Sequence, residues 1–191
     1  MTGIILAGGK NKRIKTDKAF LKIGSVPLID GLVAKLDPVF ESILIVTNTP
    51  QNYEYLGVSL VEDQWPGRGP LVGIYSGLSV SIHHYNFVVA CDMPFINIDL
   101  IRYMMDSAAE YDLVVPKLES GYESLCAVYS KNCLQPIQRQ LRSNNLKVID
   151  FFDQVKVREI TPREVRRFDP DGICFFNINT IEDFESSKEM V

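Results

Sequence analysis

Short runs of apolar residues alternate with amphipathic segments along the first two thirds of the chain. Runs that are apolar at every position are typical of strands whose two faces are both buried in a sheet. Three such runs lie at residues 3–7, 43–46 and 87–91. Residues 112–116 repeat the pattern after Asp112, and residues 59–62 form a shorter candidate strand.

Apolar residues between these runs recur every three or four positions, which is the spacing of an amphipathic helix. The pattern predicts helices from Leu28 to Leu36, from Pro70 to about Val80, and after Asn97 or Asp99, either of which is a plausible helix cap. Buried strands that alternate with helices predict a parallel or mostly parallel central sheet. The predicted fold is therefore an α/β domain of three layers.

The second half of the chain is less regular. Strands are expected at residues 125–129, 155–160 and 174–178, and helices at residues 131–141, at 146–152 and after the capping-box sequence Thr180-Ile181-Glu182-Asp183. No linker, repeat or low-complexity segment divides the sequence. Residues 1–191 are therefore predicted to form a single domain, which is an ordinary size for one hydrophobic core.

The charge of the chain is unevenly distributed. The net charge of −4 argues against nucleic-acid binding, because affinity for a phosphate backbone needs a broad basic surface. Six of the 20 Lys and Arg residues nevertheless lie between Lys10 and Lys22. This clustering suits a small anion held in one pocket.

The composition also bears on the cellular compartment. No apolar run approaches the roughly 20 residues of a transmembrane helix, and the N-terminus has no signal-peptide core, because the chain is polar from Gly8 onward. The cysteines, Cys91, Cys126, Cys133 and Cys174, lack metal-type spacing, and three of them sit in apolar stretches. We therefore expect reduced, buried cysteines in a cytoplasmic protein that does not contact a membrane.

Polar or glycine residues follow each of the first four predicted strands. Gly8 and Gly9 follow the first strand, Asn48 the second, Asp63 the third and Asp92 the fourth. In open α/β sheets, ligands bind outside the carboxyl ends of the strands. We therefore expect these residues to meet at one edge of the sheet and to form a ligand site there.

The double glycine opens a loop that is rich in cations. Glycine permits backbone conformations and close ligand approach that a Cβ atom would prevent, and Arg13 and Lys18 lie in the basic segment that follows. Backbone N–H groups and cations that converge in this way form a phosphate cradle. The segment matches neither the P-loop nor the dinucleotide-binding motif, and a basic surface loop after a strand is the alternative interpretation.

Asp92 is the sharpest single candidate for metal binding. Mg²⁺ favours one or two carboxylates together with phosphate oxygens, and Asp92 comes directly after a buried strand. On the residue alone, the alternative is that Asp92 merely begins the turn before Pro94.

Asn177 and Asn179 lie two positions apart on the last predicted strand. Residues with this spacing on a strand point to the same face, and two amides on one face can read a heterocycle through paired donors and acceptors. The alternative is that Asn179 or Thr180 only caps the next helix.

The full string Leu6-Ala7-Gly8-Gly9-x-x-x-Arg13-x-x-x-Asp17-Lys18-Ala19 resembles the signature of nucleotidyltransferases. In detail it is most similar to that of the molybdenum cofactor guanylyltransferases. The segments Gly67–Gly73, Cys91–Phe95 and Phe175–Thr180 resemble further motifs of this family. The resemblance covers essentially the whole chain and implies a three-layer, Rossmann-like nucleotidyltransferase fold.

The resemblance also implies roles for individual residues. It implies catalytic roles for Arg13, Lys18 and Asp92, with Asp92 as the metal ligand. The implied nucleotide contacts are Leu6, Ala7, Gly8, Gly9, Lys18, Asn48, Asp63 and Asp92. The implied contacts to the acceptor are Asn177 and Asn179.

The implied activity is transfer of GMP from GTP to molybdopterin, with release of pyrophosphate and with Mg²⁺ as the cofactor. Transient contacts with cofactor-synthesis proteins or molybdoenzymes are implied as well. One alternative is another nucleotidyltransferase, acting on a sugar phosphate or forming a different pterin dinucleotide. A second alternative is a GTP-binding accessory protein with weakened turnover, because Lys15 replaces a glycine that is usual in the family. A further departure is Ser124, which stands where the family usually has proline.

Overall fold

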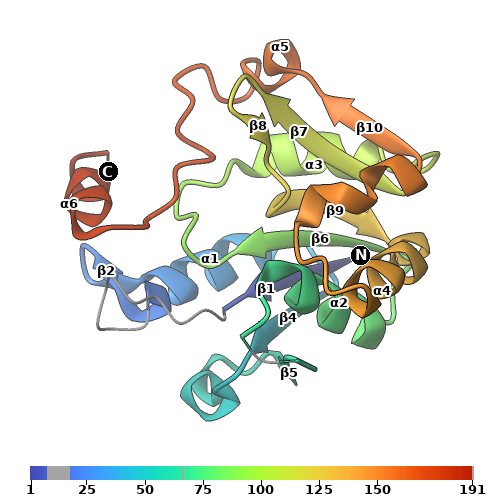
Figure 1. The fold of residues 1–191 in the computed structure, drawn as a ribbon. Helices are drawn as coiled ribbons and strands as arrows, with labels where there is room; N and C mark the ends of the chain where they lie inside the picture. The colour runs from blue at the N-terminus through green and yellow to red at the C-terminus, as the bar shows by residue number, and fades with distance from the viewer. Residues whose placement is uncertain (8–17, 66, 191) are drawn as a thin grey trace.

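A central sheet organises the chain in the computed structural model, which describes residues 1–7, 18–65 and 67–190 (Figure 1). Its strands are β1 (Thr2–Leu6), β4 (Ser42–Thr47), β5 (Ser59–Glu62), β6 (Tyr85–Ala90), β7 (Leu113–Leu118), β8 (Gly121–Tyr122), β9 (Cys126–Ser130) and β10 (Val157–Ile160). The strand order is β10-β7-β9-β6-β1-β4-β5, and β8 pairs with β7. A separate small hairpin joins β2 (Lys22–Ile23) to β3 (Val26–Pro27).

Most neighbouring strands run in the same direction. β1 pairs in parallel with β4 and with β6, and β10 pairs in parallel with β7. β9 lies antiparallel between β6 and β7. The predicted α/β architecture with a mostly parallel sheet is therefore confirmed.

Helices cover both faces of the sheet. The α-helices are α1 (Leu28–Leu36), α2 (Pro70–Val80), α3 (Ile98–Asp106), α4 (Leu134–Arg142), α5 (Pro162–Val165) and α6 (Ile181–Glu189). The 3₁₀ helices are η1 (Lys18–Phe20), η2 (Pro50–Asn52), η3 (Glu54–Leu56), η4 (Lys131–Cys133) and η5 (Val148–Gln154). Residues 146–152, predicted to be helical, thus overlap a 3₁₀ helix rather than an α-helix.

The core consists of two apolar clusters, one on each face of the sheet. One cluster joins Ile5 of β1 to α1 and α3, and the other joins Ile4 and Leu6 of β1 to α2 and α4. Successive side chains of a strand point to opposite faces, so an apolar run at every position fills both clusters. This is why the continuous apolar runs predicted the buried strands correctly.

Two helix starts follow the predicted capping chemistry. The Asn97 side chain accepts a hydrogen bond from the Leu100 amide at 2.9 Å, and the Thr180 side chain accepts one from the Asp183 amide at 3.1 Å. A side-chain oxygen at this position satisfies an amide that has no partner within the helix. Asn97 rather than Asp99 is therefore the cap of α3.

Helix α2 lies unusually close to the sheet. A Cβ atom added at Gly77 would lie 2.7 Å from Cγ2 of Ile4 and 3.2 Å from Cγ2 of Val46. Only a residue without a side chain fits at this contact, since real Cβ atoms do not approach other carbons so closely. The glycine thus allows α2 to pack directly on β1 and β4.

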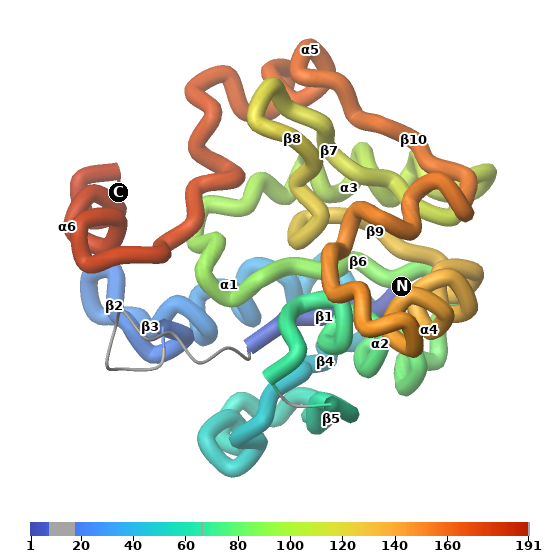
Figure 2. The backbone as a smooth tube through the Cα atoms, in the orientation of Figure 1, coloured from blue at the N-terminus to red at the C-terminus, as the bar shows by residue number. Residues whose placement is uncertain are grey.

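The strand predicted at residues 174–178 is wrong. Both sides of β6 are already occupied, by β1 and β9, so no free edge remains there for another strand. Residues 174–178 instead cross the carboxyl end of β6, where the Ile178 amide donates to the Asp92 carbonyl at 3.0 Å. Figure 2 follows this path from α5 to α6. The run is apolar because Cys174, Phe175 and Ile178 are buried in the core.

The cysteines are all free thiols. Cys126, Cys133 and Cys174 are buried, whereas Cys91 is partly exposed. Burial raises the pKa of the Cys133 thiol to about 12, so this group stays protonated at neutral pH. Within the described ranges, no helix has both the length and the apolar character needed to cross a membrane.

Candidate active site

Three predicted site residues meet at the carboxyl edge of the sheet. The Lys18 ammonium donates to Oδ2 of Asp92 at 3.1 Å and to Oδ1 of Asn179 at 2.8 Å. The Lys18 and Asp92 side chains are 14% and 20% exposed, so both are largely shielded from water but still reach solvent. One cation is thus within hydrogen-bonding distance of both a carboxylate and a side-chain amide.

Each member of this cluster is positioned by a different part of the chain. Asp92 follows β6, Lys18 begins η1, and Asn179 precedes the capping residue of α6. The hydrogen bond from Ile178 to the Asp92 carbonyl ties the Asn179 segment to the end of β6. The cluster therefore depends on the backbone of two distant segments as well as on side-chain contacts.

The other predicted carboxylate, Asp63, follows the edge strand β5 and is held by α2. Ser76 donates from Oγ to Oδ1 of Asp63 at 3.2 Å, and the same hydroxyl accepts from the Gln64 amide at 3.1 Å. Burial raises the pKa of Asp63, while the hydrogen bond from Ser76 lowers it. Ser76 could not be singled out from the sequence. The one feature that marked it was a polar side chain within a helix that is otherwise nearly all apolar.

The remaining nucleotide candidates are in different situations. Leu6 and Ala7 are buried at the end of β1, where the Ala7 amide donates to the Val46 carbonyl at 2.9 Å. Asn48 is exposed after β4. Gly8, Gly9 and Arg13, together with Lys15, lie outside the described residues.

The two candidate acceptor residues do not share a face. Asn177 turns its amide back onto the Phe175 carbonyl at 2.8 Å, whereas Asn179 reaches Lys18. The expectation of a paired amide face depended on a strand that does not form, so it is wrong. The Thr180 side chain caps helix α6. The alternative that Asn179 or Thr180 caps the next helix is therefore correct for Thr180, whereas the Asn179 side chain contacts Lys18.

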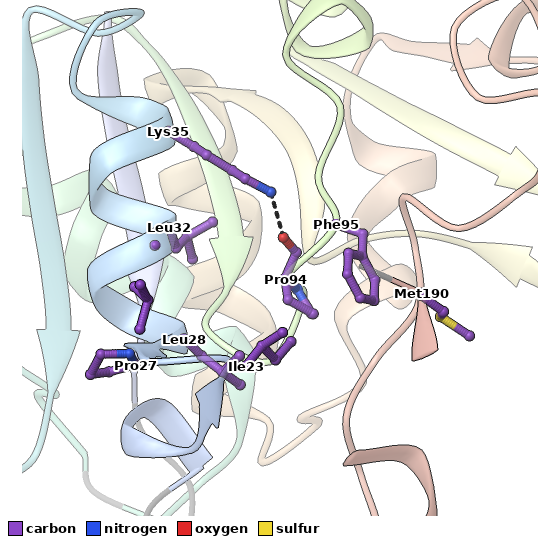
Figure 3. Close-up of a pocket in the computed structure, with 10 residues that line it drawn as sticks. Ile23, Pro27, Leu28, Leu32, Lys35, Pro94, Phe95 and Met190 are labelled. Atoms are coloured by element: carbon purple, nitrogen blue, oxygen red, sulfur yellow. Dashed lines mark hydrogen bonds between the residues drawn. The ribbon is translucent and has the colours of Figure 1, made fainter. Parts of the chain in front are cut away.

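An apolar pocket of about 390 Å³ lies beside this cluster. It is bounded by α1, by the β2–β3 hairpin and by Pro94 and Phe95, which come shortly after Asp92. Figure 3 shows Lys35 reaching across it, where its ammonium donates to the Pro94 carbonyl at 2.7 Å. The hydrogen bond from Lys35 therefore anchors the loop after Asp92 to α1.

The family of the chain is established by comparison with known proteins. A family model described as a MobA-like NTP transferase domain matches residues 3–156. The chain belongs to this family.

Relatives of the MobA-like chain carry a consistent name. The chain is 38% identical to a "Probable molybdenum cofactor guanylyltransferase" of Pelotomaculum thermopropionicum, over 99% of this chain and 92% of that protein. It is 37% identical to a "Molybdenum cofactor guanylyltransferase" of Desulfosudis oleivorans, over 100% of this chain and 96% of that protein. The family resemblance predicted from the sequence is therefore confirmed.

A solved structure supports the fold of this MobA-like domain. The crystal structure of molybdopterin-guanine dinucleotide biosynthesis protein A from Archaeoglobus fulgidus is 26% identical, with a TM-score of 0.86 over 100% of this chain and 98% of that one. The predicted nucleotidyltransferase fold is confirmed by this likeness.

The chemistry of Asp92 suits the divalent cation that nucleotidyl transfer normally uses. A carboxylate is a hard oxygen ligand of the kind Mg²⁺ prefers, and Asp92 already holds a cationic group at 3.1 Å. In the described parts of this MobA-like chain, no three His, Cys, Asp or Glu side chains gather at one point. Asp92 is the described residue at this edge that would hold such an ion.

Proposed function

We propose that the protein transfers GMP from GTP to molybdopterin and releases pyrophosphate, as the names of its relatives indicate. The observation that carries this proposal is the contact of Lys18 with both Asp92 and Asn179 at the carboxyl edge of the sheet. This edge is where ligands bind in open α/β folds. The cluster combines groups expected at the donor phosphates with a residue expected at the acceptor.

In the proposed reaction, a phosphate oxygen of molybdopterin forms a bond to the α-phosphorus of GTP. The bond from that phosphorus to its bridging oxygen breaks, and the β- and γ-phosphates leave as pyrophosphate. The protein needs to align these groups and neutralise their charge, since little acid–base chemistry is involved.

Lys18 and Arg13 supply the protein's cations for the phosphates. Asp92 would hold Mg²⁺, which supplies further charge neutralisation when it is bound. Because Lys18 contacts Asp92 directly, its ammonium lies where it can exchange that carboxylate for a phosphate oxygen. Asn179 accepts from the same ammonium and would orient it between donor and acceptor.

A binding panel and a turnover assay test the proposal together. The four nucleoside triphosphates are titrated with Mg²⁺, and pyrophosphate release is then followed with GTP in the presence and absence of molybdopterin. We expect GTP to bind most tightly and pyrophosphate to appear only when molybdopterin is added.

Two results would contradict this function. Preferential binding of another triphosphate would indicate a different nucleotidyltransferase. Tight GTP binding without pyrophosphate release would indicate an accessory protein.

A further inference from the structure

The end of β5 carries a carboxylate that the transfer chemistry does not use. Asp63 lies three strand positions from β6 in the order β6-β1-β4-β5, which at about 4.8 Å per strand is roughly 14 Å along the edge from Asp92. If the phosphates lie near Asp92, a nucleoside that extends along this edge toward β5 reaches Asp63.

An ionised carboxylate at this position has a restricted set of partners. It accepts hydrogen bonds and donates none, and it repels the negatively charged triphosphate. The neutral donors of a guanine nucleotide are its ribose hydroxyls and the N–H groups of the base. Asp63 can bind these donors only if its oxygens are correctly oriented.

Ser76 provides that orientation from a rigid site. Its side chain is fully buried, and its hydroxyl contacts both the Asp63 carboxylate and the Gln64 amide. Trp65 packs on Tyr75 of the same helix, with ring centroids 5.7 Å apart. The turn that carries Asp63 is therefore docked on α2 at two consecutive residues of the helix.

We propose that Ser76 is a positioning residue, which aims the Asp63 carboxylate at the neutral hydrogen-bond donors of the bound nucleoside. This inference rests on the proposed function, because it assumes that a guanine nucleotide binds at this edge. Ser76 does not itself touch the nucleotide and acts through Asp63.

The test compares Ser76→Ala with Ser79→Ala. Ser79 is exposed on the same helix and donates to the Tyr75 carbonyl, so its removal leaves Asp63 unchanged. Affinities for GTP, 2′-deoxy-GTP and ITP are measured with Mg²⁺. We expect Ser76→Ala to weaken GTP binding about threefold to tenfold, the equivalent of one hydrogen bond, and Ser79→Ala to have no effect.

The analogues identify the donor that Asp63 accepts from. If Asp63 accepts from the ribose 2′-hydroxyl, the preference for GTP over 2′-deoxy-GTP shrinks in Ser76→Ala. If it accepts from the exocyclic amine of the base, the preference for GTP over ITP, which lacks that amine, shrinks instead. An equal loss for all three nucleotides that vanishes in the Asp63→Ala background would assign the contact to the 3′-hydroxyl or the ring N–H, which both analogues retain. An equal loss that persists in that background would overturn the inference, because it would not act through Asp63.

The pH profile gives a readout that a packing role would not change. Asp63 accepts hydrogen bonds more strongly when it is ionised, so GTP affinity falls as pH drops through its pKa. Because the Ser76 hydrogen bond lowers that pKa, we expect the fall to begin at higher pH in Ser76→Ala. An unchanged profile would contradict the assignment.

Further variants separate failure of this inference from failure of the proposed function. Ser76→Cys removes the strong donor with little change in volume, so it replaces the alanine variant if that protein melts early. Asp63→Ala should weaken GTP binding as well, and Ser76→Ala should add nothing in that background. Absence of GTP binding in the unaltered protein would overturn the function itself, whereas additive losses would overturn only the role of Ser76.

Discussion

The two carboxylates at the carboxyl edge of the sheet, Asp92 and Asp63, have different kinds of hydrogen-bond partner. Asp92 is bound to the cationic Lys18, on a surface formed by segments from three parts of the chain. Asp63 is bound to the neutral hydroxyl of Ser76, on a helix packed tightly against the sheet. A cationic partner can be exchanged for another cation, whereas a buried hydroxyl can only orient the carboxylate. The contrast suits a phosphate-and-metal end at Asp92 and a nucleoside end at Asp63.

The largest effect is expected from removal of Asp92, the carboxylate whose partner is a cation. Asp92→Ala should reduce GMP transfer by ~10²-fold or more, since single electrostatic partners in such reactions are commonly worth that much. Pyrophosphate release at saturating Mg²⁺ measures the loss.

Asp99→Ala is a matched control, because Asp99 is exposed on α3 and pairs only with Arg102 in the described structure. We expect near-normal turnover in this control. Near-normal turnover in Asp92→Ala would remove the distinction between the two carboxylates.

A packing change should affect the Asp63 end selectively. Gly77→Ala places a Cβ atom against Ile4 and Val46, and overpacking of this kind typically costs about 1–3 kcal/mol. For a domain of this size the melting temperature should fall by roughly 2–12 °C. Because Gly77 adjoins Ser76, GTP binding should weaken while the contact between Lys18 and Asp92 persists.

Gly31→Ala serves as the control for this substitution. Gly31 lies within α1, and a Cβ atom there would meet only Cγ1 of Val26, at the ordinary contact distance of 3.8 Å. Alanine favours a helix by up to about 1 kcal/mol over glycine, so the melting temperature should hold or rise. Equal destabilisation of the two variants would argue against close packing of α2.

The smallest effect is expected on GTP affinity, and it should differ between alanine variants of Asn179 and Asn177. Asn179→Ala removes an acceptor from Lys18, so GTP affinity should fall about 2- to 10-fold, as expected for one hydrogen bond. Asn177→Ala removes only a local contact with Phe175 and should leave GTP affinity within about twofold. Isothermal titration with GTP and Mg²⁺ measures both, and identical behaviour would show that Lys18 does not depend on Asn179.

The sequence predicted the positions of site residues better than their partners. Asp92 follows an apolar run that marks a buried strand, and Asp63 follows the shorter predicted strand at residues 59–62, so their place at the sheet edge could be inferred from the pattern alone. The partner of Asp63 could not, because α2 is buried on nearly all sides. Without a clear polar face, the sequence does not indicate which residue of such a helix points toward the edge of the sheet.

The segment before α6 shows a second limit of pattern reasoning. Cys174, Phe175 and Ile178 are buried, and burial alone produces an apolar run whether or not a strand forms. Strand pairing also needs a free neighbour in the sheet, which depends on the positions of β1 and β9 elsewhere in the chain. The amide directions inferred for Asn177 and Asn179 failed for that reason.

The hydrogen bond from Lys18 to Asn179 also has a consequence for folding during synthesis, because it joins residues 161 positions apart. At ~5–20 residues per second, a ribosome needs roughly 8–32 s to make the intervening chain. Contacts between residues so distant in sequence also form late in folding, because a long loop must close first. A nascent chain can thus assemble β1, β4 and β6 long before Lys18 has its second partner, so the complete cluster forms only after residue 179 has been made.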